Sequence, residues 1–325
     1  MLINNMYTAR SLFNLHRCVG VGCLKNFSGG LPWSPTVKKL EYPSLLSRSS
    51  ESPSMGHKFP WSVTSRLMST NTLQYEHLIV SVQHGVRTIS FNRPGKKNAI
   101  NEKMFDEIVA ALQEAANDPE TIITATTGVG TVYCAGNDKN NFTDITMTEI
   151  RDLLTRHMAA FIDFPKPLVA VVNGAAVGVG STLLPLYDAV FATEKAVFFT
   201  PFSALSITAE GCSSFTYHRL MGRGKAAGML LFNEKVTATE ACKCGLVTEV
   251  FPDATFQDEV WARLHAMARL PIKSLIYSKA LIRDLYKDVL HQVNIEECKR
   301  VTECFGRLAD PEKKDYQEFI RTNWQ

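Results

Sequence analysis

The sequence lacks the features that mark membrane-spanning, disulfide-stapled and metal-binding proteins. Its apolar runs reach only about seven residues, whereas a membrane-spanning helix needs about 20. The eight cysteines include no Cys-x-x-Cys pair, and the eight histidines include no His-x-x-x-His pair. We therefore expect no transmembrane segment, no disulfide framework and no metal site.

Acidic residues are missing from the start of the chain, where none precedes Glu41. Residues 1–70 hold eight Lys/Arg, two acids and twelve serines, a net charge of +6, whereas the remaining residues carry −3. A basic, Ser-rich and acid-poor start is typical of a mitochondrial transit peptide, and a disordered leader without a targeting role is the alternative. The last three residues are Asn-Trp-Gln rather than the peroxisomal Ser-Lys-Leu. Together these features predict a protein of the mitochondrial matrix.

Signatures of several common functions are also absent. The mildly acidic remainder offers no basic surface for nucleic acid. Gly128-Val129-Gly130 begins like a dinucleotide fingerprint, but Tyr133 stands where the third glycine belongs. No Walker lysine and no Gly-x-Ser-x-Gly elbow occurs. These absences disfavour a nucleic-acid-binding protein, a dinucleotide or P-loop enzyme, and a serine hydrolase of the elbow class.

What the chain does contain is an alternation of strand and helix patterns. Apolar β-branched segments alternate with segments of helical periodicity as far as about residue 192, and the pattern beyond Phe256 is helical. This alternation predicts an α/β fold with parallel strand pairing. The expected strands are 78–82, 86–91, 122–127, 168–172 and 188–192, and the expected helices are 102–117, 150–162 and 179–186.

Two expected strand-to-turn junctions are candidates for a binding site. The expected strand 122–127 leads to Cys134–Asp138, and the expected strand 168–172 leads to Asn173–Gly180. Ligands of parallel α/β folds bind at the carboxyl ends of strands, where two backbone N–H groups can converge on one oxyanion. The alternative is that these glycines only permit tight turns and close packing. Residue patterns alone leave both interpretations open.

Four motifs in register give the chain a family resemblance over roughly residues 73–325. They are Lys96-Lys97-Asn98-Ala99-Ile100, Cys134-Ala135-Gly136-Asn137-Asp138, Phe164-Pro165-Lys166-Pro167 and Asn173-Gly174-Ala175-Ala176-Val177-Gly178. Together they resemble the crotonase (enoyl-CoA hydratase/isomerase) superfamily. The segments 141–144, 200–203 and 210–214 are similar to its Δ3,Δ2-enoyl-CoA isomerase 2 branch.

The resemblance implies a crotonase-like spiral of β-β-α units over residues 71–265. Residues 266–325 would form a C-terminal helical trimerisation region, and the protein would be a homotrimer or a hexamer. Many members of the branch carry an acyl-CoA-binding domain ahead of the isomerase domain, but residues 1–70 are too short and too poor in acids to form one.

The resemblance also implies a bound acyl-CoA thioester whose carbonyl oxygen lies between the backbone N–H groups of Asn137 and Val179. No cofactor is expected, because coenzyme A is part of the substrate. Lys279, in the C-terminal helices, is expected to reach a phosphate of a neighbouring subunit's ligand. The residues expected to contact substrate or coenzyme A are Lys96, Lys97, Asn98, Ala99, Ala135, Gly136, Asp138, Lys139, Gly178 and Phe202.

Carboxylates distinguish the reactions of this superfamily. Hydratases use two glutamates to activate water, and Thr182 and Phe202 stand at the matching positions here. Glu210 matches the single glutamate of the isomerase branch. One carboxylate can remove a proton at C2 and return it at C4, and an apolar wall such as Phe202 would raise its pKa. The resemblance therefore implies that Glu210 is the catalytic acid and base.

The expected activity is isomerisation of 3-enoyl-CoA to trans-2-enoyl-CoA, a step in the β-oxidation of unsaturated fatty acids. Two alternatives remain from the sequence. One is a module that binds coenzyme A and proteins without catalysis, as in the chromodomain Y-like proteins, which carry a similar domain. The other is a different crotonase reaction, such as acyl-CoA thioester hydrolysis or dienoyl-CoA isomerisation.

Overall fold

A β-hairpin opens the described part of the chain. The computed structural model describes residues 75–138, 141–142 and 145–308, so the expected leader lies outside the described residues. Strands β1 (Leu78–Gln83) and β2 (Val86–Phe91) pair antiparallel. His84 and Gly85 both have positive φ, as a two-residue hairpin turn requires. The strands expected at residues 78–82 and 86–91 are confirmed.

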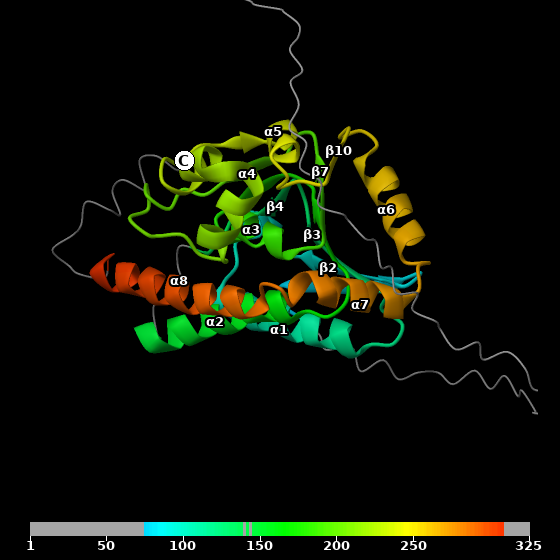
Figure 1. Ribbon diagram of the computed structural model, residues 1–325, viewed down its shortest axis with the longest axis horizontal. Coiled ribbons are helices and arrows are strands. Elements are labelled where there is room, and N and C mark those ends of the chain that lie inside the picture. Colours follow the sequence, from blue (N-terminus) through cyan, green and yellow to red (C-terminus); the bar gives the residue numbers. More distant parts are fainter. Residues whose placement is uncertain (1–74, 139–140, 143–144, 309–325) are drawn as a thin grey trace, which may run out of the picture. The chain divides into compact units, whose positions relative to one another are not determined.

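The chain then winds through three successive β-β-α units (Figure 1). The first strand of each unit joins a six-stranded sheet of order β1-β2-β3-β5-β7-β10, and the second joins a four-stranded sheet of order β4-β6-β8-β9. This alternation between two sheets is the expected spiral. The units are β3 (Ile123–Gly128), β4 (Val132–Cys134) and α2 (Met147–Asp163); β5 (Leu168–Val172), β6 (Ala175–Val177) and α3 (Val179–Thr182); and β7 (Ala189–Thr193), β8 (Val197–Phe199) and α4 (Ser213–Leu230).

The four-stranded sheet was not predicted from the sequence. Strands β4, β6 and β8 have only three residues each, too few for an alternating pattern to be recognised. The expected helix 179–186 is also shorter, because α3 ends at Thr182 and Pro185 lies in a following 3-10 turn, Leu184–Leu186. Proline has no N–H to continue the helical ladder.

Strand β5 shows how the larger sheet is buried on both faces. Leu168, Ala170 and Val172 pack in one apolar cluster together with α1 (Glu102–Asn117) and α2. The alternate residues Val169 and Val171 pack in another cluster with α6 (Phe256–Met267). The two-residue period of the strand therefore points successive side chains to helices on opposite faces.

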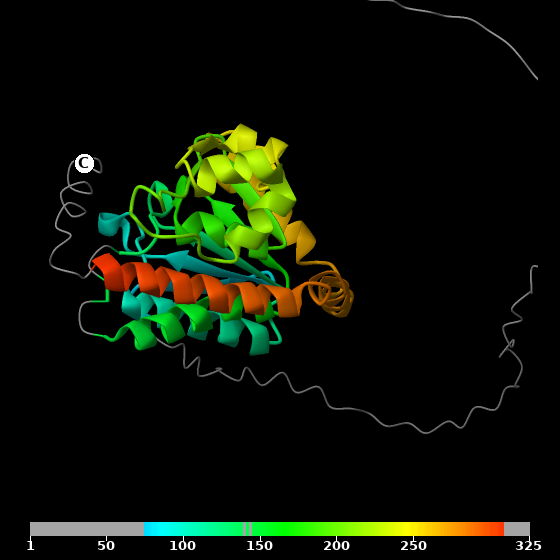
Figure 2. The same cartoon turned by 60° about the vertical axis from the view of Figure 1, so that its left-hand side comes forward.

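Helix α1 begins where the sequence predicts, because the Asn101 side chain accepts the N–H of Met104 at 3.0 Å as an N-cap. The described C-terminal part is helical, as expected: α7 (Ile272–Arg283) is followed by α8 (Lys287–Leu308). Helix α8 lies side by side with α2 in both views and also contacts α4 (Figures 1 and 2). Short elements complete the fold: a 3-10 turn at Pro94–Lys96, β9 (Val236–Thr237), α5 (Ala238–Lys243) and β10 (Glu249–Phe251).

None of the helices in the described ranges is long and apolar enough to cross a membrane.

Candidate active site

Three loops meet at one edge of the four-stranded sheet. Asn137 follows β4, Val179 follows β6, and Glu210 ends the long loop after β8. Strands β4, β6 and β8 are parallel neighbours, so their carboxyl ends lie at the same edge. The sequence assigned the first two loops to strands 122–127 and 168–172. That assignment is corrected, because the short strands β4 and β6 intervene.

A close backbone approach holds the first two loops together. Gly136 has φ of 88°, and a Cβ at this position would lie 3.0 Å from the carbonyl oxygen of Val177 and 3.6 Å from Cα of Gly178. Only glycine fits such an approach with a positive φ. The structure thus brings together Gly136 and Gly178, and with them Asn137 and Val179, which follow in the sequence.

Backbone hydrogen bonds set the directions of the two N–H groups. The Ile100 N–H donates to the Gly136 carbonyl at 2.8 Å, and the Asp138 N–H donates to the Ile100 carbonyl at 2.9 Å. In this parallel bridge the intervening Asn137 N–H points away from Ile100. Val179 opens α3, and a first-turn N–H has no acceptor within its helix. Both N–H groups are therefore available to an oxyanion.

Glu210 is a buried carboxyl group with an unusual pKa. Its side chain is 3% exposed. Burial and the nearby charge of Glu297 raise the pKa of Glu210 to about 7, and a hydrogen bond from the Asn137 side chain acts in the opposite direction. A carboxyl group with a pKa near the working pH can both accept and return a proton.

Three polar atoms at this edge have no hydrogen-bond partner among the described residues: Asn137 Oδ1, Thr182 Oγ1 and Glu210 Oε2. Thr182 belongs to the same place, because a Cβ on Gly211 would lie 2.5 Å from its hydroxyl oxygen. Buried polar atoms are rarely left unpaired in a native protein. Their grouping is consistent with a site that receives a polar group of a ligand.

The Lys96-Lys97 turn is attached to the same edge. Both lysines are exposed, and the Lys97 carbonyl accepts the N–H of Ala135 at 3.0 Å. The structure thus places two cationic side chains on a turn that is hydrogen-bonded to Ala135, two residues before Asn137. An exposed pair of this kind can attract a polyanion.

Asn98 has a structural role in that turn. Its fully buried side chain accepts the Arg93 N–H and donates to the carbonyls of Val129 and Val132. The side chain is therefore unavailable to a ligand. The neighbouring Ala99 carbonyl accepts from the Arg93 guanidinium, so backbone contacts of these two residues with coenzyme A stay a prediction.

Arg93 also forms an ion pair with Asp138 at 3.0 Å, which fixes the residue that follows Asn137. Sequence patterns gave no signal for this pairing. Phe202 is 2% exposed, in the loop that ends at Glu210. Lys139 lies outside the described residues.

Lys279 does not occupy the role expected for it. Its ammonium group donates to the Asp188 carboxylate and the Lys166 carbonyl, both at 2.7 Å. Burial lowers its pKa to about 8. The expectation that Lys279 reaches a ligand phosphate is wrong, because the side chain is 8% exposed and bound within its own chain.

A second buried acid was missed in the sequence. Glu297 of α8 accepts the N–H groups of Cys212 and Ser214 at 2.6 and 2.8 Å. Glu297 precedes the buried residue Cys298 in α8. No sequence motif connects this helix with Glu210.

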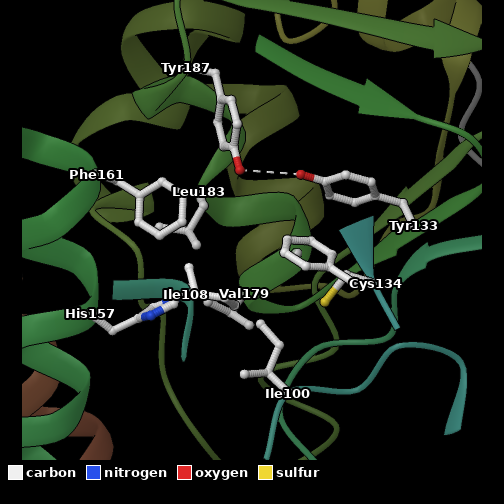
Figure 3. A pocket seen from close by; sticks show the side chains of 11 residues that line it. Ile100, Ile108, Tyr133, Cys134, His157, Phe161, Val179, Leu183 and Tyr187 are labelled. Atoms are coloured by element: carbon white, nitrogen blue, oxygen red, sulfur yellow. Dashed lines mark hydrogen bonds between the residues drawn. The ribbon is translucent and has the colours of Figure 1, made fainter. Parts of the chain in front are cut away.

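A small cavity lies behind Val179, with a volume of about 10 Å³ (Figure 3). This is room for about one water molecule and not for an acyl chain. His157 reaches toward it from α2, and neither ring nitrogen has a hydrogen-bond partner among the described residues. Other lining residues include Ile100, Ile108, Cys134, Leu183 and Tyr187.

Known proteins share both the sequence and the fold. The model of the enoyl-CoA hydratase/isomerase family matches residues 81–320. The chain is 52% identical over 231 residues to enoyl-CoA delta isomerase 2 of Homo sapiens, covering 69% of this chain and 58% of that protein. It is 44% identical over 291 residues to a Mus musculus protein named enoyl-CoA delta isomerase 3, peroxisomal, covering 87% of this chain and 89% of that protein.

Two further similarities frame the choice of function. The chain is 36% identical over 233 residues to chromodomain Y-like protein 2 of Mus musculus, covering 69% of this chain and 46% of that protein. The crystal structure of an enoyl-CoA hydratase/isomerase from Pseudoalteromonas atlantica matches with a TM-score of 0.70 and 30% identity, over 76% of this chain and 97% of that one. The chain belongs to the enoyl-CoA hydratase/isomerase family, the crotonase superfamily.

Proposed function

We propose that the protein is a Δ3,Δ2-enoyl-CoA isomerase, which converts 3-enoyl-CoA to trans-2-enoyl-CoA in the oxidation of unsaturated fatty acids. The observation that carries the proposal is the buried carboxyl group of Glu210, whose pKa is raised, beside the two N–H groups of Asn137 and Val179. The relatives named enoyl-CoA delta isomerase support it.

The reaction needs one proton carrier and one oxyanion site. Ionised Glu210 takes a proton from C2 of the acyl chain, and the C2–H electron pair moves toward the thioester carbonyl to form a dienolate. The N–H groups of Asn137 and Val179 hold the developing oxyanion, which lowers the barrier to this step. Protonated Glu210 then delivers the proton to C4, and the double bond comes to lie between C2 and C3. The protein ends in its starting state.

Glu210 suits both half-reactions because its pKa is about 7. A much stronger acid would be a poor base at C2, and a much weaker one would be a poor donor at C4. Hydration of the double bond would need a second group to activate water. Thr182, at the position where hydratases carry a glutamate, cannot serve as that base.

Coenzyme A would bind at the Lys96-Lys97 turn. The two exposed ammonium groups suit the phosphates of the nucleotide, and the turn is joined to the oxyanion segment through the Lys97–Ala135 hydrogen bond. Contacts of Gly136, Gly178, Asp138 and Phe202 with the substrate are part of the same proposal.

Turnover of defined substrates tests the proposal. Purified protein is incubated separately with trans-3-enoyl-CoA and trans-2-enoyl-CoA, and the products are separated by chromatography. We expect the 3-enoyl ester to become the trans-2-enoyl ester, with no 3-hydroxyacyl-CoA and no free coenzyme A. Release of free coenzyme A or formation of a hydroxyacyl ester would contradict the assignment in favour of another crotonase reaction.

A module that binds coenzyme A without turnover is the second candidate, and the similarity to chromodomain Y-like protein 2 favours it. Calorimetry with coenzyme A distinguishes it from the isomerase. Micromolar binding together with no turnover of any enoyl-CoA supports the binding module, whereas binding with turnover supports the enzyme.

We also propose a homotrimer, or a hexamer, assembled through the C-terminal helices. Helix α7 and its end expose several large apolar side chains, of which Leu281 is 76% and Leu285 is 73% exposed. Exposed apolar patches of this kind mark protein interfaces. Light scattering should give a mass of three or six chains, and Leu281→Glu should lower it. A wild-type monomer would contradict the proposal.

Residues 1–70 support a mitochondrial address, and we propose the matrix as the place of action. The full chain with a C-terminal fluorescent tag should colocalise with a matrix marker, and the same chain without residues 1–70 should not. A peroxisomal distribution, as in the name of the mouse relative, would contradict this proposal.

A further inference from the structure

A second buried carboxylate holds the turn on which Glu210 lies. Glu297 is 5% exposed, and its two oxygens accept the N–H groups of Cys212 and Ser214 at 2.6 and 2.8 Å. The same turn is closed by the Ser213 hydroxyl, which donates to the Glu210 carbonyl at 2.6 Å. Helix α8 is thereby connected to the residue placed at the reacting carbon.

Neither acid has a compensating cation among the described residues. In the described part of the chain, no Lys, Arg or His forms an ion pair with Glu210 or Glu297, and the influences on the two carboxyl groups include no basic side chain. Two carboxylates close together in a dry environment cannot both ionise easily, so their protonation is coupled.

The hydrogen bonds distinguish the two partners. Both oxygens of Glu297 accept backbone N–H groups at the start of α4, where the helix dipole also favours negative charge. Glu210 Oε2, in contrast, has no partner among the described residues. Burial raises the pKa of Glu297 as well, but these hydrogen bonds oppose the rise, so the anionic form is better supported at Glu297 than at Glu210.

On the basis of the function proposed above, we propose that Glu297 is a positioning residue of the site: it stays anionic, holds the Glu210 turn against α8, and keeps on Glu210 the proton that ionised Glu210 takes from C2. That proton is then returned to C4 from Glu210 and does not pass to Glu297. Glu297 acts through Glu210 and contacts no reacting atom.

Among the titratable groups around the pair, Glu297 is the main charged group that affects the pKa of Glu210. The thiols of Cys134 from β4 and Cys298 from α8 also feel the charge of Glu210, but burial raises the pKa of each to about 12 and keeps them neutral. The charge of Arg283 on α7 lowers the pKa of the Cys212 thiol, and it is not among the influences on Glu210 or Glu297. Asn137 lowers the pKa of Glu210 and Glu297 raises it, so two neighbouring side chains act on this pKa in opposite directions.

Glu297→Gln is the first test, because it removes the charge and keeps one oxygen to accept an N–H. The Glu210 carboxyl carbon is followed by 13C NMR in protein labelled at the glutamate side-chain carboxyl, with the signal assigned by its loss in Glu210→Gln. We expect the midpoint to fall by about one pH unit, the lower end of the effect of a nearby charge. The acidic limb of the kcat profile should move to lower pH by the same amount.

Glu107 provides a matched control in α1. It is 8% exposed, and its two oxygens accept the N–H groups of Glu76 and His77 at 2.8 and 2.9 Å. Glu107→Gln disturbs the same arrangement, a buried carboxylate that accepts two backbone N–H groups, at a position far along the chain from Glu210. It should lower the melting temperature like Glu297→Gln, while leaving the Glu210 midpoint and the pH profile unchanged.

An unchanged Glu210 midpoint in folded Glu297→Gln would overturn the proposal. If that variant does not fold, the wild-type titration decides, since a Glu210 midpoint near its ordinary value rather than near 7 also overturns it. Because NMR needs no turnover, a shifted midpoint in a protein inactive on every enoyl-CoA would reject the isomerase proposal and leave the carboxylate pair standing.

Discussion

The side-chain amide of Asn137 acts on the carboxyl group of Glu210 and lowers its pKa. In the proposed mechanism the same residue offers its backbone N–H to the oxyanion. Asn137 would then connect the two chemical functions proposed for the site, the proton carrier and the oxyanion hole.

Replacing Asn137 by alanine separates these two roles, because alanine keeps the backbone N–H and loses the side-chain amide. The Asn137 hydrogen bond lowers the pKa of Glu210, so Asn137→Ala should raise it. We expect the acidic limb of the kcat profile to move to higher pH, and kcat at pH 7 to fall about tenfold for each pH unit that the limb moves. An acidic limb that stays in place would show that the side chain does not act on Glu210.

The buried Glu210 should cost stability at high pH. Its folded-state pKa of about 7 lies above the ordinary value of 4.5, so its contribution to stability is fully present below pH 4.5 and is lost as pH rises through 7. Glu210→Gln should therefore be more stable than wild type at pH 8, by up to about 3 kcal/mol. Melting curves between pH 4.5 and 8 measure the effect. Glu303→Gln, an exposed change on α8, should show no such trend, and a Glu210→Gln advantage that is constant with pH would contradict the assignment.

His157 should make the protein sensitive to acid. It is fully buried between Phe105 and Phe161, and burial lowers its pKa to about 3. Its contribution to stability is therefore present above pH 6.5 and is lost as pH falls toward 3. His157→Leu should lose less stability over this range, by a difference on the order of 4 kcal/mol. Urea titrations at several pH values test this, with the exposed His218→Gln as control. Equal acid sensitivity of wild type and His157→Leu would be inconsistent with a buried neutral imidazole.

The lysine turn should affect binding and not chemistry. Lys96→Ala and Lys97→Ala each remove an exposed charge, so we expect KM for an enoyl-CoA to rise about twofold to fivefold, with less effect at high salt. The kcat should stay unchanged, because the role proposed for both side chains is limited to the phosphates of coenzyme A. Lys273→Ala, an exposed lysine on α7, is the control. A fall in kcat with unchanged KM would remove the turn from the coenzyme A site.

The strands and helices that could be predicted from the sequence are the long ones with a clear pattern. Strand 168–172 has five consecutive apolar residues and is found at those positions, and helix α1 begins at Glu102 as expected. Strands β4, β6 and β8 could not be recognised, since three residues show no period. Their positions depend on pairing with one another, which is a property of the spiral and not of any single segment.

The site residues divide in a similar way. Glycine-rich junctions around Gly136 and Gly178 mark a close backbone approach that local sequence can suggest. Glu210 has no local signature, and only the family resemblance singled it out. Glu297 was missed altogether, because its partners Cys212 and Ser214 lie far from it in the sequence and the contact depends on how α8 packs against α4.

Turnover by Glu210→Gln tests the proposed mechanism most directly. Glutamine keeps the size of the side chain and cannot carry the proton from C2 to C4. With trans-3-enoyl-CoA as substrate, we predict that kcat falls by about 10²- to 10⁴-fold, the range for a missing acid and base, while the affinity for the coenzyme A ester measured by calorimetry stays within about threefold of wild type. A Glu210→Gln protein that isomerises the substrate at the wild-type rate would contradict the account.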